Sequence, residues 1–156
     1  MGGSGDDVVD VASGSGDLNL TLGGVETVHG GGGNDSITVT DNLLQSASLG
    51  SGNDSLSLSA ASASTITIVG GDGNDAVTGS TGNDLLNLTG IETVHGGSGN
   101  DSITVTDVLL QDAELGSGND SLSLTGGASA VTITIVGGDG NDVVTGSTGN
   151  DLLYVN

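Results

Sequence analysis

The sequence repeats itself at long range, and this repetition limits the chain to folds built by stacking similar units. Residues 24–58 return with few changes as residues 90–124, at an offset of 66, and residues 65–86 return as 132–153, at an offset of 67. We interpret residues 1–156 as a single repeat domain, with long repeats at 2–69 and 70–136 and a partial repeat at 137–156. Such units stack because one unit alone cannot bury its apolar face.

A shorter motif, Gly-x-Gly-Asn-Asp or a close variant, recurs inside each long repeat. An alternating segment such as Ser36-Ile37-Thr38-Val39 follows it, with a large aliphatic residue two places after the Asp. Alternation with a period of two sends the aliphatic side chains to one face of a strand, and the glycines permit tight turns with positive φ. The pattern predicts an all-β fold, a parallel β-solenoid of about 8 coils of 17–22 residues. The motifs end at Asp35, Asp54, Asp75, Asp84, Asp101, Asp120, Asp142 and Asp151, with an opening variant at Asp7.

The spacing of the motifs predicts two stacks of aspartates on opposite edges of the solenoid. Steps of 17 to 22 residues correspond to one coil, and the step of nine from Asp75 to Asp84 corresponds to half a coil. Asp151 returns to the first edge, and Asp7 shares an edge with neither Asp35 nor Asp54. Neither Asp7 nor Asp151 has an obvious neighbour on its own edge, and Leu18 takes a carboxylate position in the first rung. The expected stacks are Asp35, Asp54 and Asp75 on one edge and Asp84, Asp101, Asp120 and Asp142 on the other.

The charge of the chain indicates that these stacks bind cations. The chain has 20 acidic residues and neither Lys nor Arg, for a net charge of −20. Carboxylates repeated at the strand spacing of about 4.8 Å repel one another unless something neutralises them. Ca²⁺ accepts six to eight carboxylate and carbonyl oxygens in irregular geometry, whereas Mg²⁺ requires a stricter octahedron. With two His and no Cys, softer metals have few ligands, so we predict Ca²⁺.

Four segments resemble a known family of repeats. "GGGGNDSIT" (30–38), "GGDGNDAVT" (70–78), "GSTGNDLLN" (79–87) and "GGSGNDSIT" (96–104) resemble the nonapeptide of the RTX, or haemolysin-type, calcium-binding β-roll. The resemblance implies a right-handed β-roll in which each Ca²⁺ lies between successive turns, about five ions in all. Aspartate ligands are implied at Asp35, Asp54, Asp75, Asp84, Asp101, Asp120 and Asp142, with Asp7 and Asp151 at the ends, and turn carbonyls at Gly33, Gly52, Gly73, Gly82, Gly99, Gly118 and Gly140.

The resemblance implies a calcium-binding structural module, not an enzyme, from an exported bacterial protein such as an adhesin, S-layer protein or toxin. Such a module folds when Ca²⁺ binds outside the cell. The start, "MGGSGDDVVD", lacks a basic and an apolar region, so we interpret the chain as an internal piece of a larger protein. One alternative is end-to-end self-assembly, because no cap is apparent and the last coil matches the first in phase. Another is a non-catalytic appendage of a secreted enzyme.

Several other functions and sites have less support from the sequence. An ice-binding face would need a uniform row of Thr, but the row three residues before the motif Asp varies among Gly, Ser, Asp and Thr. His29 and His95 recur in "ETVHGG" and are interpreted as turn-flanking residues copied by duplication, with a transition-metal site as the alternative. No Ser has a recognisable base and acid. A polyanion repels nucleic acid, and no apolar run approaches the roughly 18 residues that membrane insertion requires.

Overall fold

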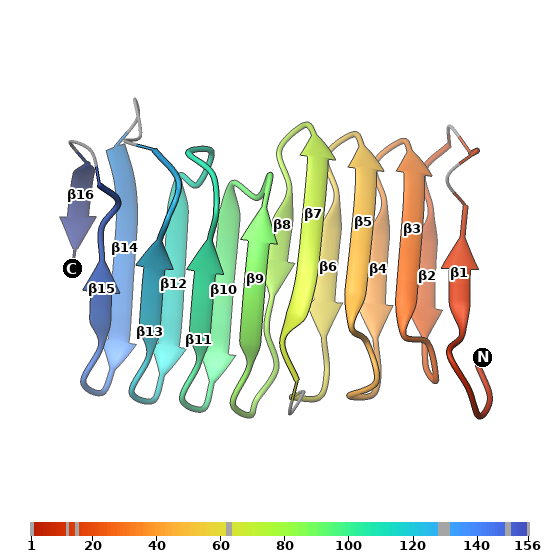
Figure 1. Cartoon of the computed structure of the whole chain (residues 1–156), viewed down its shortest axis with the longest axis horizontal. Coiled ribbons are helices and arrows are strands. Elements are labelled where there is room, and N and C mark those ends of the chain that lie inside the picture. Colours follow the sequence, from red (N-terminus) through yellow and green to blue (C-terminus); the bar gives the residue numbers. More distant parts are fainter. Residues whose placement is uncertain are drawn as a thin grey trace.

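The chain folds into a parallel β-solenoid, in which two sheets face each other along the whole length of the molecule (Figure 1). The computed structural model describes residues 2–11, 13–14, 16–61, 64–127, 132–148 and 151–155, and these contain strands and turns but no helix. Odd-numbered strands form one eight-stranded sheet, the odd sheet, and even-numbered strands form the other, the even sheet. The predicted all-β solenoid is confirmed, and its eight rungs per sheet amount to about 7 turns.

The two sheets are built from short strands that alternate along the chain. The odd sheet contains β1 (Val8–Asp10), β3 (Thr27–Gly32), β5 (Ser46–Ser51), β7 (Ile66–Asp72), β9 (Leu85–Thr89), β11 (Ser102–Val105), β13 (Ser121–Leu124) and β15 (Val143–Thr145). The even sheet contains β2 (Asn19–Leu22), β4 (Ser36–Val39), β6 (Ser55–Leu58), β8 (Ala76–Thr78), β10 (Thr93–Ser98), β12 (Asp112–Ser117), β14 (Thr132–Asp139) and β16 (Leu152–Val155). Each strand pairs in parallel with the strand one coil away.

The core is a single layer of aliphatic side chains between the sheets. Strand register stacks like on like: Val28 pairs with Ala47 in the next coil, and Ala47 with Ile68. Burial of each such side chain contributes roughly 1.5–3 kcal/mol. The predicted inward position two residues after the motif Asp is confirmed wherever the structure describes the side chain, because Val9 and Val144 pack partly against the core and six others are buried. Those buried residues are Ile37, Leu56, Val77, Leu86, Ile103 and Leu122. The side chain of Leu153, which follows Asp151, lies outside the described part of the chain.

Glycine turns close the coils, and the backbone geometry at these positions leaves little room for any other residue type. Gly52 has a φ of +131°, and a Cβ placed on it would lie 2.0 Å from the carbonyl oxygen of Gly33 in the preceding coil. Left-handed backbone and this close approach together select glycine. Of the seven predicted turn glycines, Gly82 alone lacks a positive φ, and its N–H donates to Oγ of Ser80 at 3.1 Å. Its turn is the first Gly-Asn-Asp turn of the edge that it occupies.

The aspartate motifs change edges where the nine-residue step predicts that they should. Asp75 leads into β8 of the even sheet, and Asp84 leads into β9 of the odd sheet. We call the turns that lead into even strands the even edge, at the top of Figure 1, and those that lead into odd strands the odd edge. Asp151 leads into β16 and so returns to the even edge, whereas Asp7 leads into β1 on the odd edge. Both positions confirm the predicted arrangement.

Candidate metal sites

On the even edge, three aspartates stack in consecutive coils and are linked by hydrogen bonds. The backbone N–H of Asp35 donates to Oδ1 of Asp54, and that of Asp54 donates to Oδ1 of Asp75, both at 2.8 Å. The N–H of Leu18 donates to Oδ1 of Asp35 at 2.9 Å, so a residue without a carboxylate begins this stack. Leu18 aligns with Asp84 in the sequence repeat but lies on the even edge, not on the edge of Asp84. The three side chains are at most 2% exposed. This buried stack is the even ladder.

The odd edge carries the longer stack of four aspartates, the odd ladder. Asp84 N–H donates to Oδ1 of Asp101 at 2.9 Å, and Asp101 N–H donates to Oδ1 of Asp120 at 2.8 Å. Asp120 N–H in turn donates to Oδ1 of Asp142 at 3.0 Å, across a coil of 22 residues. The first three side chains are at most 2% exposed and Asp142 is half-buried. Both predicted stacks are therefore present.

The second oxygen of most ladder aspartates is buried without a hydrogen-bond partner. A buried carboxylate oxygen with no donor is costly, and such atoms are rare in native proteins. Each is the Oδ2 atom, so the unsatisfied oxygens recur at equivalent places along both edges. They belong to Asp35, Asp54, Asp75, Asp101 and Asp120.

These unsatisfied oxygens point into small spaces that a glycine leaves open. A Cβ placed on Gly30 would lie 2.7 Å from Oδ2 of Asp35 and 2.2 Å from the carbonyl oxygen of Leu49 in the next coil. A Cβ on Gly96 would meet Oδ2 of Asp101 at 2.8 Å and the carbonyl oxygen of Leu115 at 2.2 Å. Carboxylate and carbonyl oxygens thus converge from successive coils, and such mixed oxygens are the ligands that Ca²⁺ accepts. The residues present fit the ion.

Two motif aspartates differ from the others because both oxygens of their carboxylates accept hydrogen bonds from a nearby serine. Ser80 donates from its backbone N–H to Oδ2 of Asp84 at 2.6 Å and from Oγ to Oδ1 at 3.1 Å. Ser147 makes the same two bonds to Asp151, at 2.8 and 2.7 Å. Both aspartates end the sequence Gly-Ser-Thr-Gly-Asn-Asp, and at each of them the motif changes from one edge of the solenoid to the other. These two carboxylates have local donors that the inner ladder aspartates lack.

The number of carboxylates at any one site is small. Within the described ranges, no group of three or more His, Asp or Glu side chains surrounds a common point. A cation on either edge would therefore take one or two carboxylates and complete its coordination with carbonyl oxygens and water.

Burial and neighbouring charges raise the pKa of three ladder aspartates. Burial raises the pKa of Asp75 to about 6; the hydrogen bond that it accepts from Asp54 N–H lowers this pKa, and the charges of Asp54 and Glu92 raise it. Burial also raises the pKa of Asp101 to about 6, with further increases from the charges of Asp84 and Asp120. The pKa of Asp54 is raised mainly by burial too. A bound cation would favour the charged form of each group.

A second ladder, of asparagines, runs beside the aspartates; the sequence shows the regular row of Asn, but its hydrogen bonds were not predicted. Asn53 N–H donates to Oδ1 of Asn34 at 2.7 Å, and Asn74 N–H donates to Oδ1 of Asn53 at 2.8 Å. These bonds run toward the preceding coil, opposite in direction to those of the aspartates. The odd edge has the same arrangement through Asn83, Asn100, Asn119 and Asn141. The constant Asn before each Asp was the available signal.

Two glutamates also belong to the edges, although the sequence motif does not include them. Oε2 of Glu92 accepts a hydrogen bond from Asp75 N–H, and Oε2 of Glu26 accepts one from Asp7 N–H, both at 2.7 Å. The expectation that Asp7 has no neighbour on its edge is therefore wrong. The glutamates are 7% and 9% exposed. Because neither follows a Gly-Asn-Asp turn, only the register between coils reveals them.

The two histidines lie apart, on opposite sheets. His29 lies within β3 of the odd sheet, with Nδ1 3.7 Å from Oδ2 of Asp10, and His95 lies within β10 of the even sheet, with Nδ1 3.9 Å from Oε2 of Glu114. They occupy strands, which continue for three residues beyond each histidine before the turn, so the description as turn-flanking residues is corrected. Opposite sheets prevent them from sharing a metal.

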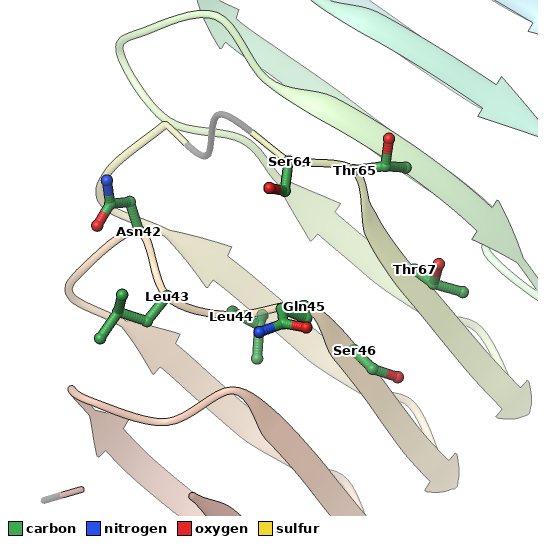
Figure 2. A pocket seen from close by; sticks show the side chains of 8 residues that line it. All are labelled: Asn42, Leu43, Leu44, Gln45, Ser46, Ser64, Thr65 and Thr67. Atoms are coloured by element: carbon green, nitrogen blue, oxygen red, sulfur yellow. The ribbon is translucent and has the colours of Figure 1, made fainter. Parts of the chain in front are cut away.

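One hollow on the described surface is lined by no ionisable side chain. Its volume is about 720 Å³, and Figure 2 shows it between the loop after β4 and the segment that enters β7. The lining consists of Asn42, Leu43, Leu44, Gln45, Ser46, Ser64, Thr65 and Thr67.

The part of the chain that the structure describes has no helix that could cross a membrane.

Comparison with known families agrees with the geometry of the edges. The model of the RTX calcium-binding nonapeptide repeat matches four copies, at residues 21–39, 67–86, 87–105 and 134–156, together more than half of the chain. Neither the curated proteins nor the solved structures give a significant match. Repeats of this family bind Ca²⁺, are typical of secreted bacterial proteins, and form β-rolls that are typically non-catalytic structural modules. The chain belongs to the family of RTX calcium-binding nonapeptide repeats.

Proposed function

We propose that this chain is a structural module that folds when Ca²⁺ binds between the stacked turns of its two edges. One observation carries the proposal: five ladder aspartates have a buried Oδ2 atom with no hydrogen-bond partner, in a chain without Lys or Arg. A cation from outside is the simplest way to satisfy them, and RTX repeats bind Ca²⁺.

The number of ions follows from the pairs of stacked aspartates. The even ladder contains two consecutive pairs and the odd ladder three, each joined by a hydrogen bond. We therefore expect about five ions, one between the members of each pair. Carbonyl oxygens that face the next coil support this number. The carbonyl oxygen of Gly33 would lie 2.0 Å from a Cβ on Gly52, and that of Gly52 would lie 1.7 Å from a Cβ on Gly73. The other proposed carbonyl ligands are Gly73, Gly82, Gly99, Gly118 and Gly140.

Binding and folding are coupled because the ladders are self-repelling. At a spacing of about 4.8 Å and an effective dielectric constant of about 20, two carboxylates repel by about 3 kcal/mol. Bound Ca²⁺ supplies the positive charge that reverses this repulsion, so its binding energy becomes folding energy. For an exported protein, such as an adhesin, S-layer protein or toxin, the chain would stay unfolded where calcium is scarce and rigidify outside the cell. In this role the module is not an enzyme, even where it is an appendage of one.

Calcium removal tests the proposal directly. Far-UV circular dichroism of the 156-residue chain is expected to show β-structure with millimolar Ca²⁺, loss of that signal after excess EGTA, and recovery when calcium is restored. Isothermal titration gives the number of ions, and Mg²⁺ at the same concentration serves as the control. A β-signal that is indifferent to EGTA, together with no heat of calcium binding, would refute the proposal.

A second candidate function, assembly of copies end to end, has a specific observation in its favour. Among the described strands, β1 and β15 are the outermost of the odd sheet, and β2 and β16 are the outermost of the even sheet. Asp7 and Asp142 lead into β1 and β15 on the same edge, so a docked second copy would place Asp7 on the odd ladder. Light scattering of the 156-residue chain with and without Ca²⁺ tests this, and a strictly monomeric chain at both conditions excludes it.

A further inference from the structure

We infer that Glu92 and Asp75 form an additional cation site, one rung beyond the last Gly-Asn-Asp turn of the even edge. The inference rests on the proposed calcium-binding function but concerns a residue outside the nonapeptide motif. It assigns to Glu92 the position that the next aspartate of the even ladder would have occupied.

The register between coils places Glu92 in line with the even ladder. Ala76 pairs with Thr93, so Glu92 stands one coil after Asp75 as Asp75 stands one coil after Asp54. The hydrogen bond is also equivalent, because Asp75 N–H donates to Oε2 of Glu92 at 2.7 Å, as Asp54 N–H donates to Oδ1 of Asp75 at 2.8 Å. With 7% of its surface exposed, Glu92 is a buried carboxylate in a chain without basic residues.

An unsatisfied oxygen points into the space between these two coils. Asp75 is 1% exposed, and its Oδ2 atom has no hydrogen-bond partner. A Cβ on Gly70 would lie 2.4 Å from this atom and 1.8 Å from the carbonyl oxygen of Gly90, which precedes Glu92 by two residues. Two carboxylates and a carbonyl thus approach from adjacent coils. This set of oxygens suits a hard divalent cation such as Ca²⁺.

The same arrangement occurs a second time in the molecule. Asp7 N–H donates to Oε2 of Glu26 at 2.7 Å, and a Cβ on Gly2 would meet both Oδ2 of Asp7 and the carbonyl oxygen of Gly24. There, however, Asp7 is only half-buried and its Oδ2 atom accepts a hydrogen bond from Gly3 N–H at 2.6 Å. The inference is therefore confined to Asp75 and Glu92, where the carboxylate oxygen is buried without a partner.

The location of this site gives it a structural role. The last aspartate pair of the even edge, Asp54 and Asp75, ends at the coil of β7 and β8, whereas the first pair of the odd edge, Asp84 and Asp101, begins at the coil of β9 and β10. Without Glu92, no ion of the even edge would join the turn after β7 to the turn after β9. A cation held by Asp75 and Glu92 links them, so the series of ions continues from one edge to the other.

The test compares two variants that each remove one negative charge. Glu92→Gln keeps an oxygen that can accept the Asp75 N–H but cannot act as an anionic ligand. Glu114→Gln is the matched control, because Glu114 is an exposed residue of β12, with 60% of its side chain accessible. Calcium per chain, measured by elemental analysis after equilibrium dialysis at saturating Ca²⁺, is expected to fall by one ion in Glu92→Gln and to stay at the wild-type value in Glu114→Gln.

The outcomes separate this inference from the proposed function. If the wild-type chain binds no calcium, the proposed function fails; if wild type and both variants bind the same number of ions, only the Glu92 site is wrong. Should Glu92→Gln not fold, crystals of the wild-type chain grown with Tb³⁺ decide by anomalous scattering. A peak between Asp75 and Glu92 supports the site, and peaks between Asp35 and Asp54 without one at Glu92 overturn it.

Discussion

The backbone N–H of Asp54 donates a 2.8 Å hydrogen bond to Oδ1 of Asp75 in the next coil, while Oδ2 of Asp75 is buried without any partner. One oxygen of the carboxylate therefore joins neighbouring coils, and the other is left for a ligand from outside. The relationship recurs along both edges, since Asp101 and Asp120 repeat it.

Asp101→Asn removes a charge from the middle of the odd ladder. Asp101 has a stacked neighbour on each side, so two candidate ion positions lose a carboxylate. At a calcium concentration of about 100 times the dissociation constant, one site contributes about 2.7 kcal/mol to folding stability. We expect the unfolding temperature in saturating Ca²⁺ to fall clearly, measured by circular dichroism. Asp112→Asn, at an exposed position of β12, is the control and is expected to change it little. Equal effects of the two variants would contradict the placement of ions in the odd ladder.

Acidification is expected to replace calcium in part. Burial raises the pKa of Asp75 and of Asp101 from 3.8 to about 6. Between these values the folded state binds more protons than the unfolded state, so stability rises as the pH falls through about 6 and the gain is complete below about 3.8. Calcium-free protein in resin-treated buffer should therefore show more β-structure by circular dichroism at pH 5 than at pH 7.5.

The double variant Asp75→Asn, Asp101→Asn provides the control for the pH experiment. Without the two carboxyl groups whose pKa is about 6, its β-structure should depend less on pH over the same range. A wild-type signal that decreases between pH 7.5 and pH 5 would contradict the prediction.

Gly52→Ala tests the close approach of successive turns. The residue has a φ of +131°, and an added Cβ would lie 2.0 Å from the carbonyl oxygen of Gly33. Strained backbone and the clash together should cost well over about 1 kcal/mol, measured by urea unfolding in saturating Ca²⁺. Gly3→Ala is the control, since a Cβ there meets nothing within 4 Å. Similar stability of the two variants would show that the turns do not stack as described.

Leu49→Ala tests the single-layer core. Leu49 is fully buried, whereas Leu43, on the same coil, is 44% exposed. Truncation of a buried leucine leaves a cavity and typically costs 2–5 kcal/mol, so Leu49→Ala should be far less stable to urea than Leu43→Ala. An effect of Leu43→Ala as large as that of Leu49→Ala would argue against the assigned interior.

Much of this architecture could be predicted from the sequence because it depends on local periodicity. The alternation in Ser36–Val39 determines which side chains face the core, and the nine-residue step from Asp75 to Asp84 moves the motif to the other edge. Strand alternation and coil length depend on the order of consecutive residues, so a repeated sequence is enough to predict them. The membership of the aspartate ladders follows from the same spacing.

Other features were decided only by which residue meets which in the next coil. The hydrogen bond from Asp7 to Glu26, the opposite direction of the Asn34–Asn53 ladder and the placement of the histidines on opposite sheets all depend on register in three dimensions. No local sequence motif identifies Glu92 or Glu26 as a ladder residue, because each accepts its hydrogen bond from a residue 17 or 19 positions away. The sequence by itself determined the coils and their charged edges; the tertiary structure decided which donors and acceptors join one coil to the next, because those contacts form between residues that are distant along the chain.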